Sequence, residues 1–227
     1  MYSGFSWTTF DDLTLHLLQA INPRRILDIG AGEGKYGRLI RAGGNHSWHV
    51  TAVEFEAGRR DELLAIGYNE VRSISALDLM QHSSEDFEVI ILGDVIEHFR
   101  KSEGQDLLEF LNYRAAYLFV VTPENMPMSS PRFYEGHNSI WRPESMRWHD
   151  LWAHCRNGQM HFYLLRGLLA GGGLPLADLV NDANDQTFMQ MVTSPNQNGQ
   201  PRQLTLHDGR SSDIDTDAGV IWTYRPN

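Results

Sequence analysis

The sequence has one cysteine, an excess of acidic over basic residues, and no long hydrophobic run. Because Cys155 is the only cysteine among 227 residues, an intramolecular disulfide is impossible and a cysteine-based structural zinc site is not expected. The 19 basic residues face 29 acidic ones, a formal net charge of -10, and no basic run or stripe is present. This charge repels phosphate backbones and anionic membranes, so we expect neither nucleic acid nor a membrane as a partner.

Two further absences concern location and metal binding. The longest apolar runs have the length of β-strands, far below the roughly twenty residues of a membrane span, and the first ten residues lack the parts of a secretory signal. We therefore expect a cytoplasmic protein. No group of histidines and carboxylates has convincing spacing for metal ligands, so the sequence points to no metal site and leaves a metal requirement open.

The most informative segment runs from Arg25 to Gly37, Arg-Ile-Leu-Asp-Ile-Gly-Ala-Gly-Glu-Gly-Lys-Tyr-Gly. Its apolar first part predicts a buried parallel strand, and the glycines predict a tight turn whose backbone can lie close to a ligand. A helix is expected to begin near Tyr36, with its N-terminal amides directed at that ligand. This arrangement suits a cofactor that contains a nucleoside.

Dinucleotide-binding folds use a similar turn, G-x-G-x-x-G, with an acidic residue about twenty positions later. Gly32, Gly34 and Gly37 fit the glycine spacing. The register argues against this alternative, because Gly30 would then lie inside the strand and the acidic position would hold arginine. Counted from Gly34, the acid is Glu54, at the end of the next apolar segment.

The residues from Asp28 to Gly34 match the motif D-x-G-x-G-x-G, and here the chain resembles the class I S-adenosylmethionine-dependent methyltransferases. The resemblance implies that Gly30, Gly32 and Gly34 pack against the methionine and ribose of S-adenosyl-L-methionine. It also implies that Asp28 orients this loop or the cofactor amine, and that Glu54 accepts hydrogen bonds from both ribose hydroxyls. The alternatives are a purely structural buried carboxylate for Asp28 and a solvated strand end for Glu54.

Two later segments extend the resemblance. In Ser75 to Leu79 the family would use Asp78 to receive the adenine amino group, with Leu79 beside the ring; the alternative for Asp78 is a helix cap. Gly-Asp-Val-Ile-Glu-His, ending at His98, is similar to the family's fourth-strand motif, which implies that Asp94 lies near the transferable methyl. For His98, packing or capping is the default alternative.

These segments alternate with helical patterns in the order that the family implies, over about residues 22–150. We expect a Rossmann-like α/β fold: a mostly parallel sheet with helices on both faces and an antiparallel C-terminal edge. One methyltransferase domain would span residues 1–227, with a helical segment at 1–21, a cofactor-binding core at 22–122, and a substrate loop and edge strands at 123–227.

Beyond the core, the sequence predicts further elements, and a polar stretch at 194–219 is either a solvated loop or an arm for a homodimer or substrate. The expected helices outside the motifs are Asp11–Ile21, Gly58–Ile66, Glu103–Tyr113, Met160–Ala170 and Leu174–Leu179, and the expected late strands are Arg202–Leu206, Thr187–Thr193 and Val220–Tyr224.

The segment 123–148 follows the fifth strand, where open α/β sheets bind their ligands. It contains His-x-Ser-x-Trp-x-Pro-Glu, which resembles a signature of bacterial methyltransferases from cell-surface glycan and natural-product clusters. We predict His137 as a general base, with Asp94 and His98 as the alternative pair. The aromatic side chains expected to line a pocket for the acceptor are Phe133, Tyr134 and Trp141.

The predicted function is methyl transfer from S-adenosyl-L-methionine to a hydroxyl or amine of a small-molecule acceptor, a sugar or a natural product. Two alternatives stay open: a cofactor-binding partner protein without catalysis, and an NAD-dependent oxidoreductase.

Overall fold

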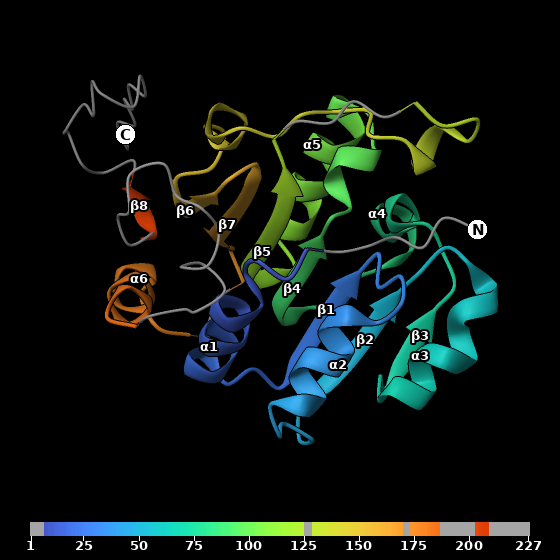
Figure 1. The fold of residues 1–227 in the computed structure, drawn as a ribbon, viewed down its shortest axis with the longest axis horizontal. Coiled ribbons are helices and arrows are strands. Elements are labelled where there is room, and N and C mark those ends of the chain that lie inside the picture. The colour runs from blue at the N-terminus through green and yellow to red at the C-terminus, as the bar shows by residue number, and fades with distance from the viewer. Residues whose placement is uncertain (1–6, 125–128, 170–172, 187–202, 209–227) are drawn as a thin grey trace.

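The computed structural model of the chain describes residues 7–124, 129–169, 173–186 and 203–208 (Figure 1). Its strands are β1 Arg25–Ile29, β2 His49–Val53, β3 Glu70–Arg72, β4 Phe87–Gly93, β5 Ala115–Pro123, β6 Leu151–Asn157, β7 Met160–Arg166 and β8 Thr205–Asp208. Its α-helices are α1 Asp11–Ile21, α2 Lys35–Ala42, α3 Arg60–Ile66, α4 Leu79–His82, α5 Lys101–Asn112 and α6 Leu176–Asn184. The 3-10 helices are η1 Ala57–Arg59, η2 Ala76–Asp78, η3 Ile96–His98, η4 Phe133–Glu135 and η5 Pro143–Met146.

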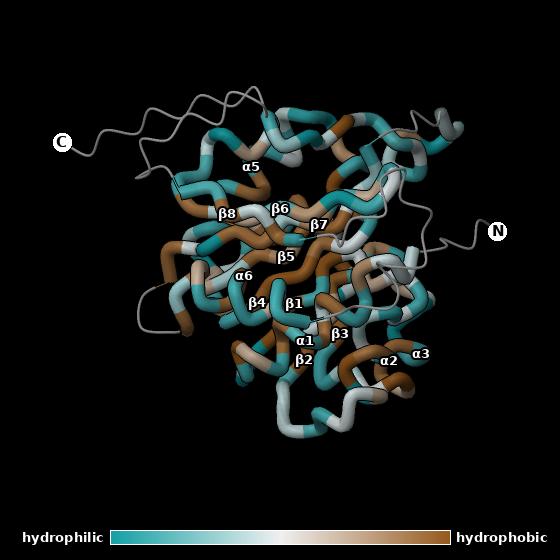
Figure 2. The backbone as a smooth tube through the Cα atoms, turned by 60° about the vertical axis from the view of Figure 1, so that its left-hand side comes forward, coloured by the Kyte–Doolittle hydropathy of each residue, from teal (hydrophilic) through white to brown (hydrophobic). Residues whose placement is uncertain are grey.

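The strands form one sheet in the order β3-β2-β1-β4-β5-β7-β6-β8 across the described parts of the chain. From β3 to β5 all neighbours are parallel. The central strands β4 and β5 are buried along most of their length, because helices cover both faces of the sheet, and Figure 2 shows them as a brown, hydrophobic centre. Because these neighbours are parallel, the carboxyl ends of the strands β1, β2, β4 and β5 lie at the same edge of the sheet.

The second part of the sheet is antiparallel. β7 lies between β5 and β6 and runs against both, and β8 adds to the outer side of β6. This confirms the expected antiparallel edge, but different residues build it. The prediction of a helix at Met160–Ala170 is wrong, since Met160–Arg166 is a strand.

The wrong prediction has a simple cause. Six of the seven residues of β7 are buried, because β7 is flanked by strands on both sides and covered on both faces. A strand buried on both faces has no alternation of buried and exposed residues, so its sequence does not distinguish it from a buried helix. The two strands predicted at 187–193 and 220–224 and most of the polar stretch at 194–219 lie outside the described residues. Of that stretch, only the short strand β8 is described, close to its predicted position.

Helices cover the two faces of the sheet. Residues of α1, α2, α3 and α6 belong to one hydrophobic cluster, and residues of α4 and α5 belong to the other. Helix α1 has the predicted bounds and lies beside α6, with His16 Nε2 2.8 Å from Asp182 Oδ2 (Figure 1). Within the described ranges, we find no helix that is both long enough and apolar enough to cross a membrane.

Candidate active site

The glycine loop after β1 has a left-handed backbone at each predicted glycine. The φ angles of Gly30, Gly32 and Gly34 are 69°, 52° and 80°. A Cβ at Gly30 would lie 2.3 Å from Val95 Cγ2, whereas the nearest atom to a Cβ at Gly32 would be the Gly30 carbonyl oxygen at 3.8 Å. The loop therefore packs tightly on the turn after β4 at Gly30 and faces open space at Gly32.

Glu54, at the end of β2, holds this loop in place. The residue is 4% exposed. Its Oε2 accepts a hydrogen bond from the Gly32 amide at 2.8 Å, and its Oε1 accepts one from the Glu56 amide at 2.9 Å. Each carboxylate oxygen has a second lone pair, so both can still accept from a ligand. The next side chain, Phe55, is 60% exposed and offers an aromatic face at the same edge, a feature that the sequence analysis missed.

Asp28 links the sheet to helix α2 through Tyr68. The Tyr68 hydroxyl donates to Asp28 Oδ2 and accepts from the Gly37 amide at 2.9 Å. Asp28 is 1% exposed, and this burial raises the pKa of its carboxyl to about 7. The chain of hydrogen bonds fits the predicted role of Asp28 in orienting the loop. Nothing in the sequence pointed to Tyr68, because its partner is 40 residues away.

Asp78 and Leu79 lie in the connection after β3. Asp78 Oδ2 accepts from the Ser75 amide at 3.2 Å, which is the helix-capping alternative, and Asp78 remains partly exposed. Leu79 is 1% exposed and packs in the cluster beneath α5. Its burial leaves little surface for an adenine ring, so both adenine contacts stay predictions.

The turn after β4 brings acidic groups and a histidine to the same edge. Asp94 has a left-handed backbone, φ 55°, which is uncommon for a residue other than glycine and is typical of functional sites. Glu97 is 1% exposed and accepts a hydrogen bond from Thr122 Oγ1 at 3.0 Å. Burial, followed by the nearby charge of Asp94, raises the pKa of Glu97 well above its usual range.

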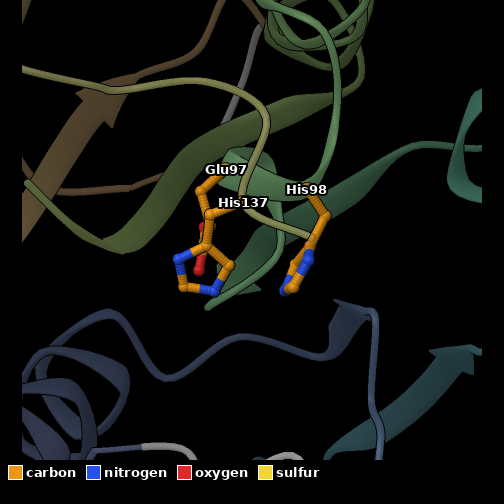
Figure 3. Close-up of side chains that lie close together, drawn as sticks. All are labelled: Glu97, His98 and His137. Atoms are coloured by element: carbon orange, nitrogen blue, oxygen red, sulfur yellow. The ribbon is translucent and has the colours of Figure 1, made fainter. Parts of the chain in front are cut away.

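Hydrogen bonds join the loop between β5 and β6 to this turn. The amides of Asn138 and Ser139 donate to the Glu97 carbonyl at 2.7 and 3.1 Å, and Asn138 Nδ2 donates to the His98 carbonyl at 2.7 Å. His137 is thereby placed beside His98, with ring centroids 4.9 Å apart and an interplanar angle of 88°. Figure 3 shows the side chains of Glu97, His98 and His137 converging. The structure thus brings together the predicted catalytic residues of two distant segments.

The predicted aromatic residues of the loop have different environments. Trp141 is fully buried, and its Nε1 donates to Ser139 Oγ at 2.8 Å, so it anchors the loop to the core. Phe133 and Tyr134 are 42% and 46% exposed. These two rings contact each other edge to face and are partly exposed, and their predicted contact with an acceptor stays a prediction.

The geometry matches a known architecture. Among solved structures, the chain is similar to the N-terminal domain of EvdMO1 with SAH bound, with a TM-score of 0.54 and 14% identity over 69% of this chain and 80% of that one. This chain has the class I methyltransferase fold. An O-methyltransferase family protein from Burkholderia thailandensis gives a TM-score of 0.52 at 14% identity, over 71% of this chain and 59% of that one.

A third solved structure, the plantazolicin methyltransferase BpumL in complex with SAH, gives a TM-score of 0.53 at 12% identity, over 70% of this chain and 85% of that one. No protein-family model and no curated protein matches the sequence. The Rossmann-like methyltransferase fold predicted from the glycine motif is confirmed by these structures.

Proposed function

We propose that this protein is an enzyme that transfers a methyl group from S-adenosyl-L-methionine to a hydroxyl or amine of a small molecule, a sugar or a natural product. The observation that carries the proposal is the hydrogen bond from the Gly32 amide to Glu54, which couples an acidic strand end to a left-handed glycine loop. The solved structures of the same fold that contain SAH, the demethylated cofactor, support it.

The residues present fit the cofactor. The position of a Cβ at Gly32 is open, so the backbone can approach a ligand there, and Glu54 keeps acceptor capacity for a sugar diol. The exposed ring of Phe55 offers apolar surface to an adenine. When bound, the cofactor supplies an electrophilic methyl group. The protein's part is to hold the two reactants in line and to exclude water.

The acceptor side of the site would lie at the end of β4. Val95 contacts the glycine loop, which puts the turn Asp94–His98 directly beside the proposed cofactor position. An acceptor hydroxyl has to lose its proton, and His137 remains the proposed base, with Asp94 and His98 as the alternative pair. Phe133 and Tyr134 would contact the acceptor with their exposed rings. The lone cysteine fits a cytoplasmic enzyme.

Calorimetry on the full chain tests the cofactor assignment. We expect S-adenosylmethionine and S-adenosylhomocysteine to bind and NAD not to bind. Glu54→Gln should weaken binding, whereas Glu62→Gln, on the exposed side of α3, should leave it unchanged and serves as the matched control. Binding of NAD, with no heat from either adenosyl compound, would refute the proposal.

An acceptor screen then tests catalysis. The full chain is incubated with methyl-labelled cofactor and a panel of hydroxylated sugars and amines, and product is separated by mass. Transfer to one class of acceptor is the expected result. Binding of cofactor without transfer to any acceptor, when the panel includes cell extract, would favour the alternative of a non-catalytic partner protein.

A further inference from the structure

Three potential metal ligands meet at the end of β4. Glu97, His98 and His137 each offer one ligand atom, and these atoms all lie within 4.8 Å of one another (Figure 3). Glu97 and His98 come from η3, and His137 comes from the loop that is hydrogen-bonded to it. The sequence alone does not reveal this group, because the two histidines are 39 positions apart.

Glu97 has only one of its two carboxylate oxygens hydrogen-bonded within the described residues. Its Oε2 accepts from Thr122, but its buried Oε1 has no hydrogen-bond partner in the described part of the chain. A buried polar atom left unpaired is costly, and the nearby negative charge of Asp94 also disfavours the ionised carboxylate of Glu97. A bound cation would offset both effects.

His98 is held in the orientation of a ligand. Its Nδ1 lies 3.0 Å from the Gly136 carbonyl oxygen. Because a carbonyl oxygen only accepts, Nδ1 carries the proton and Nε2 keeps its lone pair. Histidines that bind metals commonly donate their second ring nitrogen to a carbonyl or carboxylate in this manner, and the Thr122 hydroxyl supports Glu97 in a similar way.

We propose that Glu97, His98 and His137 bind a divalent transition-metal ion of the series from Mn²⁺ to Zn²⁺. Two imidazole nitrogens favour such ions over Mg²⁺ and Ca²⁺, which prefer oxygen ligands. Bonds of about 2.0–2.2 Å put neighbouring ligand atoms roughly 3–3.5 Å apart. The widest pair would therefore close by about 1–2 Å, which side-chain rotation provides. Three protein ligands leave a coordination position open, as in catalytic metal sites.

The ion's role would rest on the proposed methyl transfer. A Lewis acid beside the methyl acceptor lowers the pKa of an acceptor hydroxyl, whose proton then leaves to solvent. The acceptor oxygen forms its bond to the methyl carbon while the carbon–sulfur bond breaks, and the sulfur keeps that electron pair. In this case His137 acts as a ligand and not as a base.

Metal binding is measured on the full chain after treatment with a chelator and dialysis. Co²⁺ is the probe, because its visible absorption reports nitrogen and oxygen ligands. We expect one equivalent to bind, to be displaced by Zn²⁺, and to bind at least 100-fold more weakly to Glu97→Gln, His98→Gln and His137→Gln. Thr122→Val should weaken binding about 10- to 100-fold. The matched control is His46→Asn, an exposed histidine outside the group, which should bind like the unaltered chain.

The result that overturns the inference is absence of Co²⁺ binding, binding that the three ligand substitutions leave unchanged, or binding of Mg²⁺ without Co²⁺. If a variant does not fold, as judged by circular dichroism, an NMR measurement on the unaltered chain is used in place of that variant. There, Co²⁺ should shift and broaden the imidazole NMR signals of His98 and His137, and unshifted signals would count against the site. Calorimetry with S-adenosylhomocysteine runs in parallel. If that compound binds and Co²⁺ does not, only the metal inference fails; if Co²⁺ binds and that compound does not, only the proposed function fails.

Discussion

Alanine substitutions at two glycines of the loop should separate packing from ligand binding. Gly30 and Gly32 share a left-handed backbone, so alanine at either position costs about 1–2 kcal/mol of folding free energy. At Gly30 the added Cβ would also lie 2.3 Å from Val95 Cγ2, and such overpacking adds roughly 1–3 kcal/mol. We therefore expect a cost of about 2–5 kcal/mol for Gly30→Ala and about 1–2 kcal/mol for Gly32→Ala.

The two substitutions should have the opposite order of effect on ligand binding. Relative to the folding free energy that each one costs, Gly32→Ala should weaken binding more than Gly30→Ala. A Cβ at Gly32 would have no neighbour closer than 3.8 Å among the described residues, and this is the space proposed for the cofactor. Gly32→Ala should therefore weaken binding of S-adenosylhomocysteine by more than tenfold while the protein stays folded. Urea unfolding followed by tryptophan fluorescence gives the stabilities, and calorimetry gives the affinities.

A double variant isolates the contact with Val95. Val95→Ala removes the methyl groups that the Gly30→Ala side chain would strike, so the double variant should recover most of the overpacking cost and none of the backbone cost. Three outcomes would show that the loop is not packed as described. They are equal losses of folding free energy at Gly30 and Gly32, no recovery of stability in the double variant, and full cofactor affinity in Gly32→Ala.

Three further predictions concern the residues around this loop. Glu54→Gln places an amide group against the backbone amides that the carboxylate accepts from, so affinity for S-adenosylhomocysteine should fall about 10- to 100-fold in calorimetry; unchanged affinity would contradict the ribose role. Tyr68→Phe leaves buried Asp28 and the Gly37 amide without a partner and should cost about 2–4 kcal/mol in urea unfolding, whereas a loss below about 0.5 kcal/mol would count against the link. Burial lowers the pKa of His149 to about 4, whereas the pKa of a histidine in the unfolded chain is near 6.5. Because the unfolded state binds the proton more readily, the folding stability should fall as the pH drops from about 6.5 towards 4. At pH 5 the loss amounts to about 2 kcal/mol, and His149→Gln should flatten this part of the pH–stability curve; an unchanged slope would refute it.

The fold could be predicted largely because its signals are local. The strand before Asp28, the glycines after it and the helix from Lys35 occupy neighbouring positions, and each residue favours the conformation that it adopts. The observed bounds of helix α1 agree with the prediction. Its apolar period indicates the buried face, and the following Asn22-Pro23 indicates where the helix ends. Strand β7 could not be recognised, because β5 and β6 flank it and six of its seven residues are buried, so the alternation typical of a strand is absent.

The site residues divide in the same way. Sequence alone determined which residues stand at the carboxyl ends of the strands, because each end is marked by a break from apolar to polar or glycine residues. Only the tertiary structure decided which of them meet. Glu54 contacts Gly32 because β2 lies beside β1. Tyr68, in the connection between α3 and β3, contacts Asp28 of β1. His137 lies near Glu97 because backbone hydrogen bonds hold the loop there. Such encounters depend on the order of the strands and on the path of the loop, and neither is written in the spacing of residues along the chain.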